Sequence, residues 1–473
     1  MQKFKNVLFV AVVFTMLICV ASAQAGDAKN VILLISDGMG FGSLMAADYY
    51  TGEQAVYETF TTKYMMSTYA VDGSYDPTGA VGNFEYWKQN PTDSSAAATA
   101  MATGVKTYNG AINVDTSYNP LTTIVEVASG LGKATGVVTS VEFSHATPAG
   151  MVAHNVSRND YAGIANEMIY NSDLDVIMGA GHPEWDNGTQ YSGASKYVGG
   201  DATYNDLSAG TATAKDGQTW TYIESKADFE ALATASDTPD KVLGLAMNNY
   251  TLQQGRPGDG SVVDPTTMVD NVPTLETMTK GALNALDNNK DGFFLMVEGG
   301  AVDWANHANQ PGREVEEQMD FNASVQAVVD WVAANSSWDE TLVIVTADHE
   351  CGYLWGPDAD APGGMYNLVE DNGEGNMPGT EYFSGDHTNM LVPLFAMGAG
   401  SEMFASLVDG VDPFMAGLIA GFDGEFTGQY VDNTDIFNVM SGSMSQPVPI
   451  PAAAWLLGSG LLGLMGLRRR FQV

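Results

Sequence analysis

Residues 30–40 read NVILLISDGMG. The run VILLIS (31–36) is a short stretch of apolar residues that ends at an acidic residue, Asp37, and a glycine-containing turn. A short apolar run beside turn residues is typical of a strand that is buried on both faces. The stretch therefore predicts a central strand of a covered sheet, with a carboxylate at the carboxyl end of that strand.

Similar apolar runs recur along the chain, and helical patterns separate several of them. The helical patterns include LTTIVEVASGLG (121–132) and EVEEQMDFNASVQAVVDWVAA (314–334). The further predicted strands are ATGVVTS (134–140), DVIMGA (175–180), KVLGLAM (241–247), FFLMVE (293–298), TLVIVTA (341–347) and MLVPLFAMG (390–398). Alternating strands and helices predict an α/β fold, with a mainly parallel central sheet covered by helices on both faces.

The 473 residues suffice for one large α/β domain with insertions, or for two domains, and we place a single domain at 26–440. Residues 181–265 are rich in Gly, Thr, Asp and Tyr and have weak periodicity, so we expect a loop-rich insertion that decorates the sheet. Residues 441–448 (SGSMSQPV) are interpreted as a linker to the C-terminal segment.

Residues 1–25 have the layout of a secretory signal peptide. Lys3 and Lys5 precede an apolar run, and the small residues Ala21, Ala23 and Ala25 follow it. We expect cleavage near Ala23 or Ala25. The alternative is a membrane anchor, for which the run is shorter than the roughly 20 residues that a membrane span needs.

Residues 449–473 form a second targeting element. Pro449 and Pro451 introduce an apolar stretch over 452–467, and three arginines follow it at 468–470. The arrangement resembles the VPxP form of the PEP-CTERM sorting signal, which implies a transient transmembrane tail and processing by an exosortase-type protease. A simple C-terminal membrane anchor is the alternative. The two ends together predict an exported protein, in the periplasm or at the cell surface of a Gram-negative bacterium.

The chain is strongly acidic, with a formal net charge of −38. Such a surface repels nucleic acids and anionic membranes, so no nucleic-acid partner is expected. It also repels phosphate esters, so a site for such anions must be locally positive, and bound metal ions achieve this. Cys351 is the one cysteine outside the predicted signal peptide, so no intrachain disulfide is expected. We interpret it as a small buried thiol; the alternative is a thiolate that competes for a metal ion.

Acidic residues stand repeatedly at the ends of predicted strands, where open α/β sheets bind their ligands. Asp37 follows the first strand, Glu298 ends FFLMV, and Asp348 and His349 follow TLVIVTA. One such residue could be a helix cap or part of a loop. Several carboxylates at one edge of a sheet repel each other unless cations hold them, so the pattern predicts a metal site.

Two further histidines fit the same site. Asp303 and His307 are four residues apart, so on a helix they share one face and could bind one ion. A solvated helix face explains such a pair equally simply when it stands alone. His387 precedes the last predicted strand. Carboxylate with imidazole is a zinc ligand set, whereas oxygen ligands alone suit magnesium.

The segment PTDSSAAATAMATG (91–104) supplies a candidate nucleophile. Thr92 or Asp93 is a plausible N-cap, and the alanine-rich run after it favours a helix. Ser94 then lies in the first turn, where free backbone N–H groups and the helix dipole favour a phosphate group. An ordinary capping serine is the alternative interpretation.

Taken together, these motifs resemble the alkaline phosphatase family over most of the mature chain. The matching strings are NVILLISDGMG (30–40), TDSSAAATAMATGVKTYNGA (92–111), HATPAGMVAHNVSR (145–158), GFFLMVEGGAVDWANHAN (292–309), TADHECG (346–352), GDHTNMLVPLFAMG (385–398) and VDNTDIFNVM (431–440). Their order and spacing fit the family. The resemblance implies a phosphatase that acts on small phosphate monoesters with two zinc ions and one magnesium ion. A homodimer is left open.

The resemblance also implies a role for each matched residue. Ser94 is the nucleophile that forms a phosphoserine, and Arg158 binds the phosphate oxygens. Asp37 bridges the second zinc and the magnesium. The implied ligands are Asp303, His307 and His387 for the first zinc, Asp37, Asp348 and His349 for the second, and Asp37, Thr147 and Glu298 for magnesium.

Two positions depart from the pattern of the familiar periplasmic bacterial enzyme. His145 replaces an aspartate beside the magnesium site, and Trp304 replaces a lysine beside the first zinc. The resemblance implies that both lie next to the ligands and shift the balance of ion and phosphate binding.

Three other interpretations compete with this one. Residues 287–298 (DNNKDGFFLMVE) match a calcium-loop pattern, but the second half of that loop is the predicted strand, so we expect a turn into the strand instead. A phosphodiesterase or sulfatase of the same superfamily would use a threonine or a modified cysteine as nucleophile. A catalytically inactive, calcium-binding surface protein would have no need to keep the matched ligands.

Overall fold

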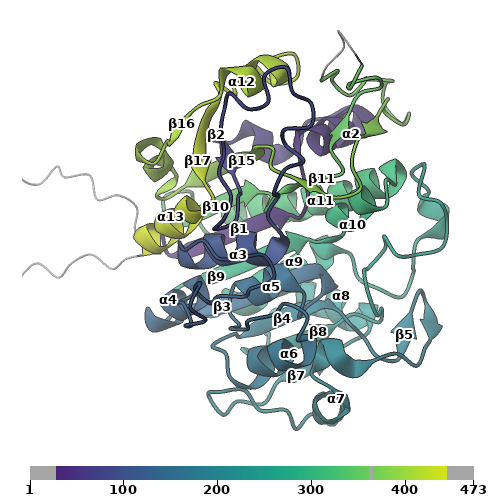
Figure 1. Ribbon diagram of the computed structural model, residues 1–473. Coiled ribbons are helices and arrows are strands. Elements are labelled where there is room, and N and C mark those ends of the chain that lie inside the picture. Colours follow the sequence, from purple (N-terminus) through teal and green to yellow (C-terminus); the bar gives the residue numbers. More distant parts are fainter. Residues whose placement is uncertain (1–27, 362–365, 445–473) are drawn as a thin grey trace, which may run out of the picture.

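The computed structural model describes residues 28–361 and 366–444 (Figure 1). The predicted signal peptide and the predicted sorting tail lie outside these described residues. None of the helices within the described ranges is both long and apolar enough to cross a membrane.

One sheet of eleven strands organises the molecule (Figure 1). Its strands, in spatial order, are β16 (Gly410–Val411), β17 (Gln429–Asp432), β2 (Thr62–Ser67), β15 (Val392–Gly398), β10 (Thr341–Thr346), β1 (Asn30–Ser36), β9 (Phe293–Gly299), β3 (Ala134–Glu142), β4 (Val176–Ala180), β8 (Val242–Leu245) and β7 (Thr221–Ile223). All neighbours from β10 to β7 pair in parallel, whereas β15 is antiparallel to both β10 and β2. The prediction of a mainly parallel sheet is confirmed.

Helices cover both faces of this sheet, and the side chains of β1 show why. All seven residues of β1 are buried; Ile32 and Leu34 belong to one apolar core, and Val31, Leu33 and Ile35 belong to the other. The first core is closed by α2 (Phe41–Thr51), α8 (Lys226–Thr234), α9 (Leu275–Leu286) and α11 (Pro311–Asn335). The second is closed by α3 (Ser94–Thr103), α4 (Ile124–Gly130), α5 (Ala146–Gly150), α6 (Tyr161–Tyr170) and α13 (Thr434–Met444).

The remaining elements are short. They are η1 (Val56–Thr59), β5 (Trp185–Asp186), β6 (Thr189–Gln190), η2 (Ser195–Val198), α7 (Asp201–Ser208), η3 (Pro265–Thr267), α10 (Ala301–His307), β11 (Glu350–Cys351), β12 (Leu354–Trp355), β13 (Glu381–Tyr382), β14 (His387–Thr388), η4 (Ser401–Ser406) and α12 (Pro413–Ile419). Of these, α10 and the paired strands β11 and β14 carry residues of the candidate site.

The region 181–265 is more ordered than its composition suggests. It contributes β8 and β7 to the edge of the main sheet, and α7 and α8 lie within it. Helix α8 begins with a capping box of Ser225 and Asp228 and buries Phe229 and Leu232. The region therefore extends the sheet, besides decorating it with loops.

The predicted linker over 441–448 is wrong at its start. Helix α13 continues to Met444, because Met440, Ser443 and Met444 are buried against the sheet. The Ser443 carbonyl also accepts a hydrogen bond of 2.8 Å from the Ala28 N–H, which ties this helix to the beginning of the described chain. Residues 445–448 lie outside the described residues.

The three central strands place the candidate site. Because β1, β9 and β10 are parallel, their carboxyl ends meet at one edge of the sheet. In the register of the sheet, Ile35 lies opposite both Glu298 and Thr346. The residues 288–292 form a turn between α9 and β9, as expected, so the calcium-loop pattern is not part of a helix–loop–helix unit.

Candidate active site

Three carboxylates converge where the central strands end. Asp37, Glu298 and Asp348 are each at most 1% exposed. Both carboxylate oxygens of Asp37, Oδ2 of Asp348 and Oε1 of Glu298 have no hydrogen-bond partner. Buried carboxylates without partners are costly, so this arrangement calls for bound cations.

The pKa values of the three carboxyl groups also indicate that this cluster needs bound cations. Burial, followed by the charges of Asp348, Asp303 and Glu298, raises the pKa of Asp37 well above its usual value. Burial also raises the pKa of Asp348 to about 6 and that of Glu298 to about 7. The cluster therefore resists negative charge unless a cation compensates it.

A second group of ligand atoms lies around α10. Asp303 Oδ2 is 3.4 Å from His307 Nε2, and Asp303 Oδ1 is 3.4 Å from His387 Nε2. The two imidazole Nε2 atoms are 3.0 Å apart. The Nδ1 atoms face backbone carbonyls, that of Gly385 at 2.8 Å for His307 and that of Thr92 at 2.9 Å for His387. A ring whose Nδ1–H is held in this way presents Nε2 to a metal ion.

The candidate nucleophile begins helix α3. Asp93 is the N-cap, and its Oδ1 accepts a hydrogen bond of 2.9 Å from the Ala96 N–H. Ser94 Oγ lies 3.2 Å from His349 Nε2, which in turn is 3.2 Å from Asp348 Oδ2 and 3.6 Å from Asp37 Oδ1. The Ser94 hydroxyl thus sits directly against the group formed by Asp37, Asp348 and His349.

The neighbouring Ser95 is engaged elsewhere. Its hydroxyl donates to the Asp93 carboxylate, with 2.8 Å to each oxygen, and accepts a hydrogen bond from the Gly110 N–H at 3.0 Å. Of the two serines, Ser94 is therefore the one whose hydroxyl faces the metal-ligand residues.

Asp93 also holds Arg158 in place. Arg158 Nη1 donates to Asp93 Oδ2 at 3.0 Å, and Arg158 Nη2 lies 3.4 Å from His145 Nε2. Although burial opposes the charged form, the Asp93 carboxylate raises the pKa of Arg158, so the guanidinium stays positive. The sequence suggested Asp93 only as a helix cap; its contact with Arg158, 65 residues away, carried no signal in the sequence.

Thr147 and Thr139 lie beside Glu298. The Thr139 hydroxyl donates a short hydrogen bond to Glu298 Oε2, and the Thr147 side chain is close enough to lower the pKa of Glu298. Thr147 is fully buried on α5. Asp37, Thr147 and Glu298 offer only oxygen atoms, which suits magnesium better than zinc.

His145 and Trp304 form an aromatic wall next to these ligands. Their ring centroids are 5.5 Å apart, and Tyr161 stacks on His145 at 6.3 Å. Burial, and then the charge of Arg158, lowers the pKa of His145 to about 3, so this imidazole is neutral. Both departures from the familiar sequence pattern are therefore placed at the site.

The residues around the nucleophile line a cavity of about 520 Å³. The lining consists of Ser94, His145, Arg158, Gln254, Asp303, Trp304, His307, Ala308 and His387. Gln254 was not predicted: it comes from the inserted region, and its Nε2 donates to Gln310 Oε1 at 3.0 Å. No motif pointed to it, because only the folded insertion brings it here.

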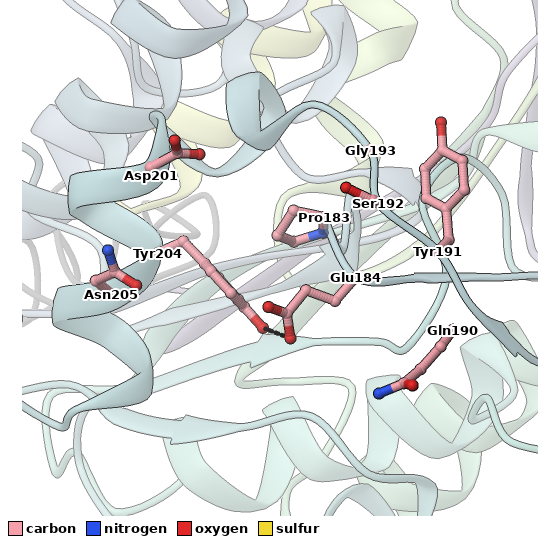
Figure 2. Close-up of a pocket in the computed structure, with 9 residues that line it drawn as sticks. All are labelled: Pro183, Glu184, Gln190, Tyr191, Ser192, Gly193, Asp201, Tyr204 and Asn205. Atoms are coloured by element: carbon pink, nitrogen blue, oxygen red, sulfur yellow. Dashed lines mark hydrogen bonds between the residues drawn. The ribbon is translucent and has the colours of Figure 1, made fainter.

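A larger cavity, of about 650 Å³, lies in the insertion (Figure 2). The Tyr204 hydroxyl donates a hydrogen bond of 3.2 Å to Glu184 Oε2. Figure 2 shows Asp201 on the same helix as Tyr204 and Tyr191 on the opposite side. Among the described residues that line it there is neither a histidine nor a basic side chain. The smaller cavity, which joins a nucleophile, imidazoles and Arg158, is therefore the candidate active site.

The other histidines and the cysteine have structural partners. His154 contacts Glu167 Oε1 at 3.0 Å and the Leu121 carbonyl at 2.8 Å, and His182 lies 3.3 Å from Glu224 Oε2. Cys351 is fully buried, with Sγ 3.7 Å from the Asp303 carbonyl, in agreement with the predicted buried thiol.

Ligand atoms that lie within 4.8 Å of one another form two groups in the described residues. One group contains Asp303, His307, Cys351 and His387, and the other contains Asp37, Asp348 and His349. Apart from Cys351, these are the two sets predicted for zinc. The donors are mixed carboxylates and imidazoles, all of them buried or largely buried except His307, which is exposed. Such a donor set fits zinc chemically.

Comparison with known proteins shows which protein family this chain resembles in sequence. A sequence profile of the family described as alkaline phosphatase matches residues 28–369. An alkaline phosphatase of Escherichia fergusonii is 32% identical over 438 residues, which span 83% of this chain and 86% of the relative. Alkaline phosphatase 3 of Bacillus subtilis is 33% identical over 353 residues, which span 73% of this chain and 65% of the relative.

Solved structures of alkaline phosphatases also superimpose on this chain. The alkaline phosphatase from the Antarctic bacterium TAB5 superimposes with a TM-score of 0.61 at 25% identity, and covers 90% of this chain and 100% of its own. A histidine-to-aspartate variant of that enzyme, described with magnesium bound in its M3 site, superimposes with a TM-score of 0.62.

Proposed function

Because this chain belongs to the alkaline phosphatase family and is a phosphatase, we propose that it hydrolyses phosphate monoesters through a phosphoserine on Ser94, at a site with two zinc ions and one magnesium ion. The observation that carries the proposal is the position of Ser94 Oγ, 3.2 Å from His349 Nε2 at the N-terminus of α3. Inorganic phosphate is the product.

The N-terminus of α3 supports Ser94 as nucleophile. The first backbone N–H groups of a helix and the positive end of its dipole favour a phosphoryl group bound there. Attack by Ser94 Oγ forms an O–P bond while the bond from phosphorus to the ester oxygen breaks, and the alcohol leaves. Water then breaks the serine–phosphate bond and restores the hydroxyl of Ser94.

Arg158 is proposed to bind the phosphoryl oxygens of the substrate. The Asp93 carboxylate holds its guanidinium 3.0 Å away, so the planar group is oriented before the substrate arrives. Trp304 and Gln254 line the same cavity and are placed to contact the alcohol part of the ester.

The carboxylates and imidazoles of these groups are proposed to hold the metal ions. When bound, the ions would neutralise the carboxylates and stabilise negative charge on the entering and leaving oxygens. The proposed ligands are Asp303, His307 and His387 for the first zinc, Asp37, Asp348 and His349 for the second, and Asp37, Thr147 and Glu298 for magnesium.

The proposed location is outside the inner membrane. The support is in the sequence: a signal-peptide pattern over 1–25, and an ordered set of prolines, apolar residues and arginines over 449–473. Intact-mass measurement of protein from the native cell surface should show a chain that lacks both segments. Full-length chains held firmly in the inner membrane would favour a permanent anchor instead.

A substrate panel tests the function. The metal-loaded protein should hydrolyse an aryl phosphate much faster than an aryl phosphodiester or an aryl sulfate, and acid quenching should trap phosphate on Ser94. Removal of the metals with a chelator should abolish the activity, and zinc with magnesium should restore it. A preference for the diester or the sulfate would favour the related phosphodiesterases or sulfatases. Full activity after confirmed metal loss would remove the metals from the mechanism.

A further inference from the structure

The cavity beside Ser94 contains a tryptophan that takes part in neither apolar core. Seven tryptophans lie in the described residues. Five of them belong to a core or pack against one: Trp87, Trp220, Trp331, Trp338 and Trp355. Trp304 does not, although it is the largest side chain that lines this cavity of about 520 Å³. Its ring therefore forms part of the cavity wall without closing a core.

The contacts of Trp304 leave it available to a ligand. It is half-buried on α10, and within the described residues its one aromatic contact is with His145, at 5.5 Å between the ring centroids. Its indole N–H donates no hydrogen bond to the described part of the chain. A partly exposed tryptophan in a cavity, without such contacts, is well suited to pack against a flat ring of a ligand.

Neighbouring rings hold this aromatic wall in place. The Tyr161 ring stacks on the buried His145 ring at 6.3 Å, with 17° between the two planes. Tyr161 also contacts Tyr197 at 4.9 Å, and Lys196 Nζ lies over these two tyrosine rings at 4.7 Å and 4.5 Å. Because the rings support one another, the wall is ordered before a substrate arrives, which lowers the entropy cost of binding.

The charges of the cavity match an uncharged alcohol part of the ester. Arg158 is the one lysine or arginine among the described residues that line it. Its guanidinium is paired with Asp93 at 3.0 Å and is proposed to bind the phosphoryl group. The imidazoles of His307 and His387 are proposed metal ligands. The lining therefore has no further cationic side chain for a carboxylate or a second phosphate on the alcohol part.

An amide group provides a polar edge beside the aromatic wall. Gln254 Nε2 donates to Gln310 Oε1 at 3.0 Å, while Gln254 Oε1 has no hydrogen-bond partner within the described ranges. The loop that carries Gln254 is fastened by Arg256, whose Nη2 lies 2.5 Å from Glu316 Oε2. An apolar ring surface with a few fixed polar groups is the usual lining of a site for a small organic ligand.

We propose that this cavity selects phosphate monoesters whose alcohol part is uncharged and carries a flat aromatic ring that lies against Trp304. The inference rests on the proposed phosphatase function and names the substrate class of that site. A volume of about 520 Å³ lies within the range of about 300–1,000 Å³ that is usual for small-molecule sites. Arylalkyl phosphates and nucleoside 5′-monophosphates share the required chemistry, which is an aromatic ring near the ester oxygen.

Pairs of substrates with matched leaving groups test the inference on the metal-loaded protein. The first pair is phenylethyl phosphate, with a flat ring, and cyclohexylethyl phosphate, with a puckered and more apolar ring; both release a primary alcohol. Apolar burial alone favours the cyclohexyl ester. A kcat/KM that is roughly threefold to tenfold higher for the phenyl ester therefore reports contact with the aromatic wall.

The second pair distinguishes the two sources of such a ring. Adenosine 5′-monophosphate and methyl riboside 5′-phosphate release the same type of ribose hydroxyl, and only the nucleotide has a base. Stacking of the base on Trp304 should raise kcat/KM for the nucleotide roughly tenfold. Selectivity in the first pair alone would assign the site to short arylalkyl esters, and selectivity in both pairs would extend the class to nucleotides.

Variants locate the effect on Trp304. Trp304→Leu should reduce the ratio of the first pair to about one, whereas Trp304→Phe keeps a ring and should retain most of the selectivity. A ratio measured within one protein cancels any change in its metal content. Trp185→Leu is the matched control, because Trp185 also lies outside both cores and does not line this cavity; it should keep the wild-type ratio.

The outcomes separate this inference from the proposed function. Equal rates for the two members of the first pair in the wild type would overturn the inference while leaving the phosphatase function intact, and this result needs no variant to fold. An unchanged ratio in Trp304→Leu would also overturn it. Absence of hydrolysis of all four esters by the metal-loaded wild type would instead overturn the proposed function, and the inference with it.

Discussion

Two clusters of buried charge in this molecule differ in how their charges are compensated. At the carboxyl ends of the central strands, Asp37, Glu298 and Asp348 have oxygen atoms without any partner. Beneath the insertion, Glu316 Oε2 instead meets Arg256 Nη2 at 2.5 Å and Arg313 Nη1 at 3.1 Å, and Glu316 Oε1 accepts the Asp264 N–H at 2.6 Å.

The comparison distinguishes the carboxylate cluster, which is the proposed metal site, from the arginine cluster, which stabilises the fold. The arginine cluster finds its counter-charges within the protein: Arg256 also donates to the carbonyls of Gln253 and Asp264, and Arg313 donates to that of Pro257. It fastens the loop that carries Gln254 onto α11. The carboxylate cluster has no such partners within the described residues and is the proposed metal site. Substitutions there should therefore change the catalytic activity, whereas substitutions in the arginine cluster should change the free energy of unfolding.

The largest effect is expected from Ser94→Ala, which breaks the chemistry of the carboxylate cluster. Loss of the nucleophile should lower kcat by at least ~10⁴-fold, or about 5.5 kcal/mol of barrier, because covalent catalysis is lost. Steady-state hydrolysis of an aryl phosphate measures the effect, with metal content and melting temperature expected to stay unchanged. Ser95→Ala is the control and should be mild; acid-stable phosphate on Ser95 would show that the assignment is wrong.

Glu316→Gln should have the next largest effect, on stability. It leaves two buried guanidinium groups without a carboxylate, which should cost about 3–5 kcal/mol in the free energy of unfolding. Denaturant unfolding of the metal-loaded protein measures this. The control is Glu276→Gln, which removes an exposed helical ion pair with Lys280 and should cost less than about 1 kcal/mol. Equal costs for the two variants would contradict the distinction between the clusters.

Arg158→Lys sharpens the comparison, because it keeps the charge beside Asp93 and removes only the planar guanidinium. We expect kcat/KM to fall by roughly tenfold to a hundredfold, and inhibition by inorganic phosphate to weaken, since a lysine cannot make the paired contacts of an arginine. Both are read from initial rates. Unchanged kinetics together with unchanged phosphate inhibition would place Arg158 outside the substrate site.

The smallest effect is expected from His145→Asp. A carboxylate in place of this neutral imidazole makes the surroundings of Glu298 and Thr147 more negative, so magnesium should dissociate more slowly, by about tenfold. Metal analysis after timed dialysis measures the retained magnesium. Equal retention in the two proteins would mean that position 145 does not reach the ion.

Much of the fold follows from apolar runs, because the central strands are buried on both faces and carry few polar residues. Strands β1, β9 and β10 were all predicted on this basis. By contrast, β2 (TKYMMS) mixes polar and apolar residues, and it was missed because its first half is only partly buried. Helices α7 and α8 were missed because glycine, threonine and aspartate dominate their surroundings, although each buries two residues.

The residues predicted for the site lie within or beside the candidate active site. Strand ends, helix spacing and a helix N-terminus are local features of the sequence, and they indicated the acidic residues, His307, His349 and Ser94. The resemblance to the family alone indicated Arg158, Thr147, His145 and Trp304. What could not be predicted depends on contacts between distant segments. Asp93 holds Arg158, and the loop fastened by Arg256 brings Gln254 to the cavity. Neither contact leaves a trace in local spacing or composition.

The position of β1 between β9 and β10 also sets the order in which the protein can mature. Val31 pairs with Phe294 on one side and with Leu342 on the other. A ribosome makes the chain from its amino terminus at about 5–20 residues per second, so β1 emerges long before either neighbour. Asp37 meets Asp348 and His349 only after most of the chain has been synthesised. The proposed ligand group of Asp37, Asp348 and His349 is therefore incomplete until β9 and β10 have joined β1, so an ion held by all three residues would bind late in folding.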